Sequence, residues 1–250
     1  MIIQKSSREI MRMKAAGMIT ARAVHAAGKA IEPGITTREL DEIVRKTMEE
    51  NGATPSCLNY NGFPASACIS VNNKVIHGIP SDKEVIKEGD IVSIDTCAGF
   101  DGFHGDCAYT FPCGDISEDA KRLLCTTQEA LYEGINMAQA GNRIGDIGSA
   151  VQRYVEARGY SVVRDFTGHG VGSNIHEDPA VPNYGHPGRG VRLLPGMVIA
   201  IEPMINAGTS DIIILPDQWT VVTADGKLSA HFEHTIAITS DGPVILTALD

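Results

Sequence analysis

The chain has 250 residues and a formal net charge of −10, with 43% hydrophobic and 21% charged residues. These proportions are typical of a soluble globular protein with one large domain or two small ones. The acidic balance without a Lys/Arg run argues against a nucleic-acid-binding protein. No apolar run approaches the roughly 20 residues of a membrane span, and the first residues lack a signal-peptide core. The sequence therefore predicts a cytoplasmic protein that acts on neither membranes nor nucleic acids.

Four helices are predicted from capping residues, apolar residues at helical spacing and terminal glycines. Residues 57–80, in contrast, indicate short strands and turns before a central hairpin. The start and end signals of the helices are Ser6 and Pro33-Gly34, Thr36 and Gly52, Ser117 and Gly141, and, for the fourth, apolar spacing from Ile147 to Gly159.

The stretch 88–111 predicts two strands, rich in β-branched and aromatic residues, that are joined by a tight turn. A hairpin that folds symmetrically about Phe100-Asp101 would place Asp95 directly opposite Asp106. Like charges about 5 Å apart on paired strands are destabilising. A shared proton or a metal cluster would offset that repulsion, unless both carboxylates are solvated at a loop mouth.

The two halves of the chain resemble each other at an offset of 107 residues. A second apolar strand ends in Glu202, and a returning segment, 230–238, brings Glu233 beside it. Since no linker separates the halves, we expect one α+β domain over residues 1–250, with related halves at about 1–115 and 116–250. The matched positions include Gly34 and Gly141, Val44 and Val151, Gly52 and Gly159, and Asp95 and Glu202.

Four carboxylates and three imidazoles are the candidates for chemistry. Four carboxylates in one pocket would become protonated in part unless cations neutralised them. Two divalent ions about 3.5 Å apart would do so and would acidify a bridging water molecule. Carboxylates with an imidazole suit Mn, Fe, Co or Zn. The candidates are Asp95, Asp106, Glu202, Glu233, His77, His169 and His176.

Several strings carry a resemblance to a known family: VIHGIP, IVSIDTC with GFHGDCAYTF, TGHGVG with IHEDP, IAIEPMIN and DQWTVVTADGKLSAHFEHTIAIT. Over residues 2–249 the chain resembles the methionine aminopeptidases of the short bacterial type. The resemblance implies the pita-bread fold, in which two pseudo-twofold related halves form an antiparallel sheet covered by helices. It also implies removal of an N-terminal methionine, mainly ahead of a small second residue, by water activated at a pair of divalent ions.

The resemblance assigns a role to each candidate. Asp106 and Glu233 would bridge the two metal ions, Asp95 would bind one of them, and His169 and Glu202 would bind the other. Glu202 would also accept the proton of the water. Of the catalytic histidines, His176 would contact the substrate near the scissile carbonyl and His77 would lie beside the leaving amide. His104 and His231 are close to ligands in sequence and are expected to orient carboxylates.

By the same resemblance, the substrate pocket would be lined by soft and aromatic side chains, which a thioether prefers. Ile175 departs from the family, because relatives often carry an aromatic residue there, and this predicts a roomier pocket wall. Asn72 and Ser229 would help to hold a structural monovalent cation. The expected pocket residues are Cys57, Tyr60, Phe63, Cys68, His77, His176 and Trp219.

Two other functions are considered. An X-Pro aminopeptidase of the same fold would share all five ligands, although such enzymes usually carry an extra N-terminal domain. A non-catalytic binding protein on the same scaffold would be expected to have lost ligands, and all five are present. The expected partner is a peptide or nascent chain that begins with methionine, with transient ribosome association, and the protein is expected to be a monomer.

Overall fold

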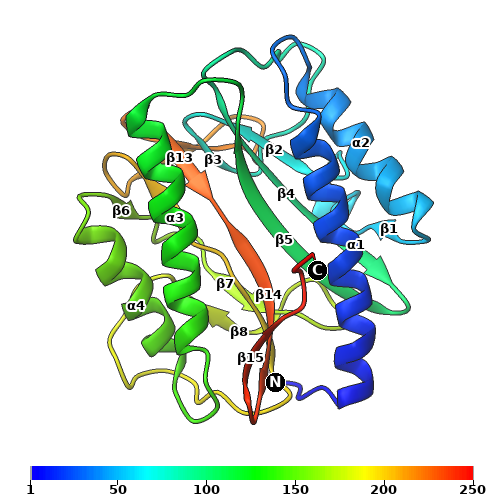
Figure 1. Cartoon of the computed structure of the whole chain (residues 1–250), viewed down its shortest axis with the longest axis vertical. Coiled ribbons are helices and arrows are strands. Elements are labelled where there is room, and N and C mark those ends of the chain that lie inside the picture. Colours follow the sequence, from blue (N-terminus) through cyan, green and yellow to red (C-terminus); the bar gives the residue numbers. More distant parts are fainter. Residues whose placement is uncertain (1, 250) are drawn as a thin grey trace.

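The computed structural model describes residues 2–249, in which four helices lie over one face of a curved antiparallel sheet (Figure 1). No helix in this range is long and apolar enough to cross a membrane. The helices are α1 (Ser7–Lys29), α2 (Thr37–Glu50), α3 (Glu118–Met137) and α4 (Ile144–Glu156), with a 3-10 turn at Tyr60–Gly62. The strands are β1 (Thr54–Pro55), β2 (Cys68–Val71), β3 (Lys74–Ile76), β4 (Ile91–Phe100), β5 (Phe103–Pro112), β6 (Ser161–Val162), β7 (Gly168–Gly170), β8 (Glu177–Val181), β9 (Val198–Ile201), β10 (Met204–Asn206), β11 (Ile212–Ile214), β12 (Val221–Thr223), β13 (Ser229–His231), β14 (Glu233–Thr239) and β15 (Gly242–Ile245).

The capping boxes start the first two helices where the sequence predicts. The side chain of Ser6 accepts the amide of Glu9, whose carboxylate accepts the amide of Ser6 in return. Thr36 and Glu39 form the same arrangement at α2. Three helices end earlier than predicted, at Lys29, Met137 and Glu156, because the glycine or proline signals lie in the turns that follow the last helical residues.

The central hairpin has a different register from the one predicted. Phe100 pairs with Phe103, so Asp95 lies opposite Ala108 rather than opposite Asp106. The turn is the dipeptide Asp101-Gly102, with φ of 50° and 77°. Asp-Gly favours this two-residue turn because both positions have positive φ and match the strand twist. Asp95 and Asp106 are therefore diagonal neighbours on one face, which still keeps their carboxyl groups close.

The main sheet has nine strands, with the path β1-β4-β5-β14-β9-β7-β8, β2 beside β4 and β15 beside β14. Every strand pair assigned within residues 2–249 is antiparallel. In Figure 1, α1 and α2 lie over the half of this face with β4 and β5, while α3 and α4 lie over its other half. The predicted α+β class, with helices over an antiparallel sheet, is confirmed.

The offset of 107 residues is a property of the fold. Helices α2 and α4 begin 107 positions apart, as do β4 and β9. Three pairs of glycines at this offset adopt nearly equal positive φ angles, which only glycine tolerates well. These are Gly34 and Gly141 at 104° and 98°, Gly52 and Gly159 at 74° and 82°, and Gly89 and Gly196 at 89° and 91°. The division into one domain with halves at about 1–115 and 116–250 stays a prediction.

Helix α1 packs directly on β5 through two glycines. A Cβ atom added at Gly105 would lie 2.5 Å from the Cα of Gly17, and one added at Gly17 would lie 2.5 Å from the carbonyl oxygen of Leu246. A side chain at Gly105 would push the helix off the strand that carries Asp106, and one at Gly17 would push it off the segment that follows β15.

We expect Gly105→Ala to lower the free energy of unfolding by about 2–3 kcal/mol, as overpacking of a dense core does. Gly102→Ala in the same hairpin is the matched control. It meets no backbone atom within 4 Å, so only its left-handed conformation costs energy, about 1 kcal/mol. Scanning calorimetry of both variants measures the difference, and equal losses would contradict the packing argument.

Candidate metal centre and active-site cavity

Five neighbouring strands of the main sheet each supply one of the predicted metal ligands. Asp95 lies on β4 and Asp106 on β5. Glu233 begins β14, Glu202 directly follows β9, and His169 is the middle residue of β7. Since paired strands lie about 4.8 Å apart, the sheet gathers residues that are far apart in sequence.

The side chains converge on one point. One ligand atom each from Asp106, His169 and Glu233 lies within 4.8 Å of the others. The Nε2 atom of His169 is 3.5 Å from Oε1 of Glu202 and 3.8 Å from Oδ2 of Asp106. Asp95 lines the same cavity. All five predicted ligands are thus brought together.

Burial of four carboxyl groups side by side opposes their ionisation. Burial raises the pKa of Asp95 to about 7. Burial, together with the charges of the neighbouring carboxylates, raises the pKa of Asp106, Glu202 and Glu233 well above their ordinary values. Such a cluster needs protons or bound cations to offset its repulsion.

His169 is held as the neutral tautomer whose Nε2 lone pair can bind a metal ion. Its Nδ1 atom is 2.9 Å from the carbonyl oxygen of Gly170, so Nδ1–H donates and the lone pair of Nε2 faces the carboxylates. Burial lowers the pKa of His169 to about 4, which keeps the ring neutral.

Several buried atoms at the site have no hydrogen-bond partner within residues 2–249. They include Oε1 of Glu233 and both ring nitrogens of His231. The Nε2 atom of His231 lies 3.7 Å from Oε2 of Glu202, which is too far for a hydrogen bond, so its role in orienting a carboxylate stays a prediction. His104 instead contacts Ser56, with 2.9 Å between Nδ1 and Oγ. Four carboxylates, one imidazole and unpaired buried oxygen atoms fit divalent cations.

A cavity of about 470 Å³ opens from the carboxylate cluster. Its wall contains the aromatic pair Phe63 and Trp219, whose ring centroids are 5.2 Å apart. Burial raises the pKa of the Cys57 and Cys68 thiols, so both remain neutral and apolar. The predicted pocket residues all line this cavity: Cys57, Tyr60, Phe63, Cys68, His77, His176 and Trp219.

The two predicted catalytic histidines are fixed in different ways. His176 has Nδ1 at 2.8 Å from the hydroxyl of Tyr60, and its ring centroid is 4.1 Å from that of His169. His77 has a φ of 57°, in the left-handed region, and its ring meets Phe166 and Trp219 edge to face. Strained backbone at a side chain that lines a cavity is typical of functional sites.

Residues 11–240 match the model of metallopeptidase family M24. The chain belongs to metallopeptidase family M24. Its relatives in this family include "Methionine aminopeptidase" of Clostridium perfringens, 54% identical over the full length of both chains, and "Methionine aminopeptidase 1" of Bacillus subtilis, 53% identical over 99% of both.

Solved structures of this family have the same fold. The methionine aminopeptidase of Thermotoga maritima superposes with a TM-score of 0.98 at 44% identity and full coverage of both chains. The prolidase of Pyrococcus horikoshii superposes with a TM-score of 0.79 at 28% identity, covering 99% of this chain but 64% of the prolidase. The predicted pita-bread fold and the resemblance to methionine aminopeptidases are confirmed.

Sequence reasoning missed part of the cavity of this M24 peptidase. Asp165, Phe166 and Thr167 line it, and their position just before the predicted ligand His169 was a usable signal. Thr235 was also missed: its hydroxyl accepts from the amide of Asp106 at 2.9 Å and donates to the carbonyl oxygen at 2.8 Å. Only the pairing of β14 with β5 reveals that role. Asn61 and Ile76 complete the unpredicted lining, and Ile175 lies on the wall as expected.

We expect Asp95 to make the metal-free protein lose stability as the pH rises from 5 to 8, relative to an Asp95→Asn variant that keeps the buried histidines. The folded pKa of Asp95 is raised to about 7, so this carboxyl group holds more protons in the folded than in the unfolded state over this range, and its contribution to stability falls with pH. The loss should reach at least about 2 kcal/mol, or roughly 5 °C in melting temperature. Calorimetry of chelator-treated protein measures it. Added divalent metal should flatten the dependence, and an unchanged dependence with metal would contradict a carboxylate metal site.

Proposed function

We propose that this chain is a methionine aminopeptidase, which hydrolyses the first peptide bond of a chain beginning with methionine, mainly when the second residue is small. The supporting observation is the cavity, whose floor is a cluster of five metal-type ligands and whose wall is soft and aromatic. Relatives more than 50% identical over nearly the whole chain are named methionine aminopeptidases.

Asp106 and Glu233 would hold both metal ions, Asp95 one of them, and His169 and Glu202 the other. Cobalt, manganese, iron and zinc all suit this donor set. When bound, the ions supply an acidic water molecule and polarise the scissile carbonyl. The neighbouring carboxylates would also hold the free α-amine of the substrate, which restricts cleavage to the terminal residue.

The chain's own residues perform the proton transfers and the binding. Glu202 accepts the proton of the attacking water, and burial together with the neighbouring carboxylates raises its pKa, which favours the protonated form that results. His176 donates a hydrogen bond to the substrate near the scissile carbonyl. His77 lies beside the leaving amide. Burial lowers the pKa of both histidines, so both are neutral hydrogen-bonding groups rather than cations.

The methionine side chain lies between Trp219, Phe63 and the two neutral thiols of Cys57 and Cys68. A thioether packs favourably against aromatic rings and soft sulfur atoms. Ile175 lies on the same wall and is 7% exposed, and it leaves more room there than an aromatic side chain would.

An X-Pro aminopeptidase is the second candidate, because the fold is shared with prolidases. It is not favoured: the prolidase match covers 64% of the prolidase, whereas the methionine aminopeptidases match along their whole length. A non-catalytic binding protein would not need five intact ligands.

Further parts of the proposal concern partners and a second ion. The protein acts as a cytoplasmic monomer that meets nascent chains near the ribosome. Asn72 and Ser229 help to hold a monovalent cation. Support for that site comes from the left-handed backbone of Asn72 and from the amide of Ser229, which donates to the carbonyl oxygen of Asn72 at 2.9 Å.

Chelator-treated protein, reconstituted singly with Mn, Fe, Co or Zn, should release methionine from Met-Ala-Ser. Release from Met-Leu-Ser should be at least about tenfold slower, since a pocket of fixed size discriminates by this order. Cleavage of Ala-Pro-Ser alone would indicate the X-Pro activity instead. Absence of turnover with bound metal would support the binding protein.

Asp106→Asn should lower kcat/KM by about 1,000-fold or more, because it removes a ligand shared by both ions. Asp165→Asn is the matched control, since Asp165 lines the same cavity outside the proposed ligand set. Metal content by mass spectrometry should fall in the first variant and stay unchanged in the second. Equal metal loss in both would refute the ligand assignment.

A further inference from the structure

A buried ion pair joins the start of the chain to the loop that carries His176. The Nζ atom of Lys5 lies 2.7 Å from Oε2 of Glu177, and the two side chains are only 4% and 6% exposed. The two residues are 172 positions apart. Neither residue lines the cavity, so the metal centre gives no reason for a charged pair to be buried here. Such burial is costly unless both partners are well paired.

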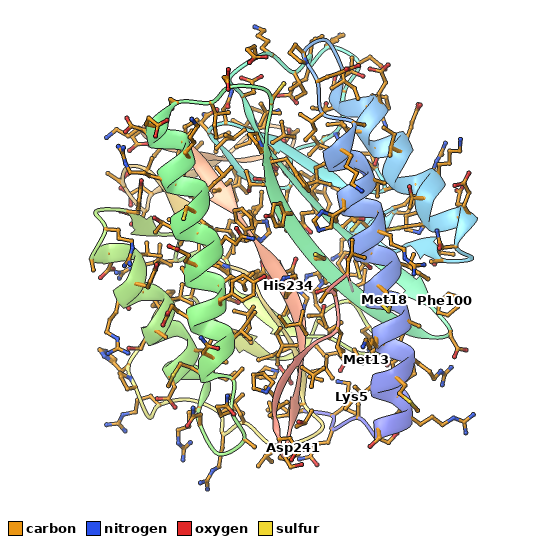
Figure 2. The ribbon with its side chains drawn as sticks, in the orientation of Figure 1. Lys5, Met13, Met18, Phe100, His234 and Asp241 are labelled. Carbon is orange, nitrogen blue, oxygen red and sulfur yellow. The ribbon has the colours of Figure 1, made fainter. Side chains whose placement is uncertain are left out.

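The backbone of Lys5 is held by the helix start at Ser6 and by the turn at Gly196. It directly precedes Ser6, whose capping box with Glu9 fixes the start of α1. The amide of Lys5 donates to the carbonyl oxygen of Gly196 at 2.6 Å. A Cβ atom at Gly196 would lie 2.9 Å from the carbonyl oxygen of Lys5, so the segment rests directly on that turn. Figure 2 shows Lys5 at the beginning of α1, on the side toward the strands.

Glu177 organises the loop between β7 and β8. Its Oε1 atom accepts the amide of Asn174 at 3.2 Å, and the amide of Gly172 donates to the carbonyl oxygen of Asn174 at 3.1 Å. A Cβ atom at Gly172 would lie 2.3 Å from Oε1 of Glu177. The loop is therefore folded around the carboxylate that Lys5 holds.

His176 is the residue next to Glu177, at the end of this loop. Its own side-chain contacts lie on the cavity side, with Tyr60 and His169. A shift of Glu177 moves the backbone of His176 and changes the direction of its ring. A misplacement of about 1 Å at a catalytic group can lower a rate by as much as 100-fold.

We propose that Lys5 is a positioning residue for His176: the ion pair with Glu177 holds the loop 171–176 in the geometry that catalysis requires. The segment before α1 thereby becomes part of the active-site architecture without touching substrate. This inference rests on the proposed function, since it assumes that His176 contacts the substrate.

The test is Lys5→Met, made both in the native chain and in a His176→Ala background. In the native chain we expect kcat for Met-Ala-Ser to fall about tenfold, with KM within about twofold. In the His176→Ala background the same change should cost less than about twofold, because residues that act through one another are not additive. An equal loss in both backgrounds would overturn the proposal.

Arg12→Met is the matched control. Arg12 also lies near the start of α1 and pairs with a distant residue, Asp101, but in an exposed position at the turn between β4 and β5. It should leave kcat unchanged. If Lys5→Met does not fold, the double variant Lys5→Met with Glu177→Gln replaces it in both backgrounds, because this double variant leaves no uncompensated buried charge.

Hydrogen exchange separates this proposal from the proposed function. Amides of residues 171–177 should exchange at least about threefold faster in Lys5→Met than in the native chain, and not in Arg12→Met. Unchanged exchange in the loop would overturn the positioning role. Failure of the native chain to release methionine would instead overturn the proposed function.

Discussion

The burial of four carboxyl groups at one point of the sheet is the constraint on which the rest of the structure depends. Desolvation and mutual repulsion make this cluster unstable as a set of anions, and they raise the pKa values of its members. The surroundings are arranged for a cation. The ring of His169 is neutral with its lone pair directed inward, and Oε1 of Glu233 has no donor within residues 2–249. A binding site is thus obtained at the expense of local stability, as is common at functional sites.

The same constraint explains why the cavity has a charged floor and a neutral wall. The floor consists of groups whose charge must be neutralised, while the wall consists of groups kept neutral by burial, such as the thiols of Cys57 and Cys68. A peptide N-terminus has a charged amine next to an apolar side chain, and a cavity with these two parts would accommodate both. Behind the floor, the side-chain hydroxyl of Thr235 binds both the amide and the carbonyl oxygen of Asp106.

Much of the fold could be predicted from sequence, because capping boxes and glycine positions are local signals, and the structure brings together the five residues that the family resemblance proposed as ligands. Helices α2 and α4 were predicted from a capping box and from apolar spacing, and their starts lie 107 positions apart, which is the offset seen in the sequence. The predicted hairpin register was wrong because the prediction centred the turn on Phe100-Asp101. In the structure both central residues of the turn are left-handed, and these residues are Asp101 and Gly102. Lys5 and Thr235 were missed because their partners, Glu177 and Asp106, lie 172 and 129 positions away.

The two related halves contribute unequal shares to the centre. The first supplies Asp95 and Asp106, and the second supplies His169, Glu202 and Glu233. In the main sheet they join where β5 pairs with β14, Glu233 with Ala108 and His234 with Cys107, and outside it β3 pairs with β12. Because neither half holds more than three of the five proposed ligands, the complete set exists only when both halves are folded against each other.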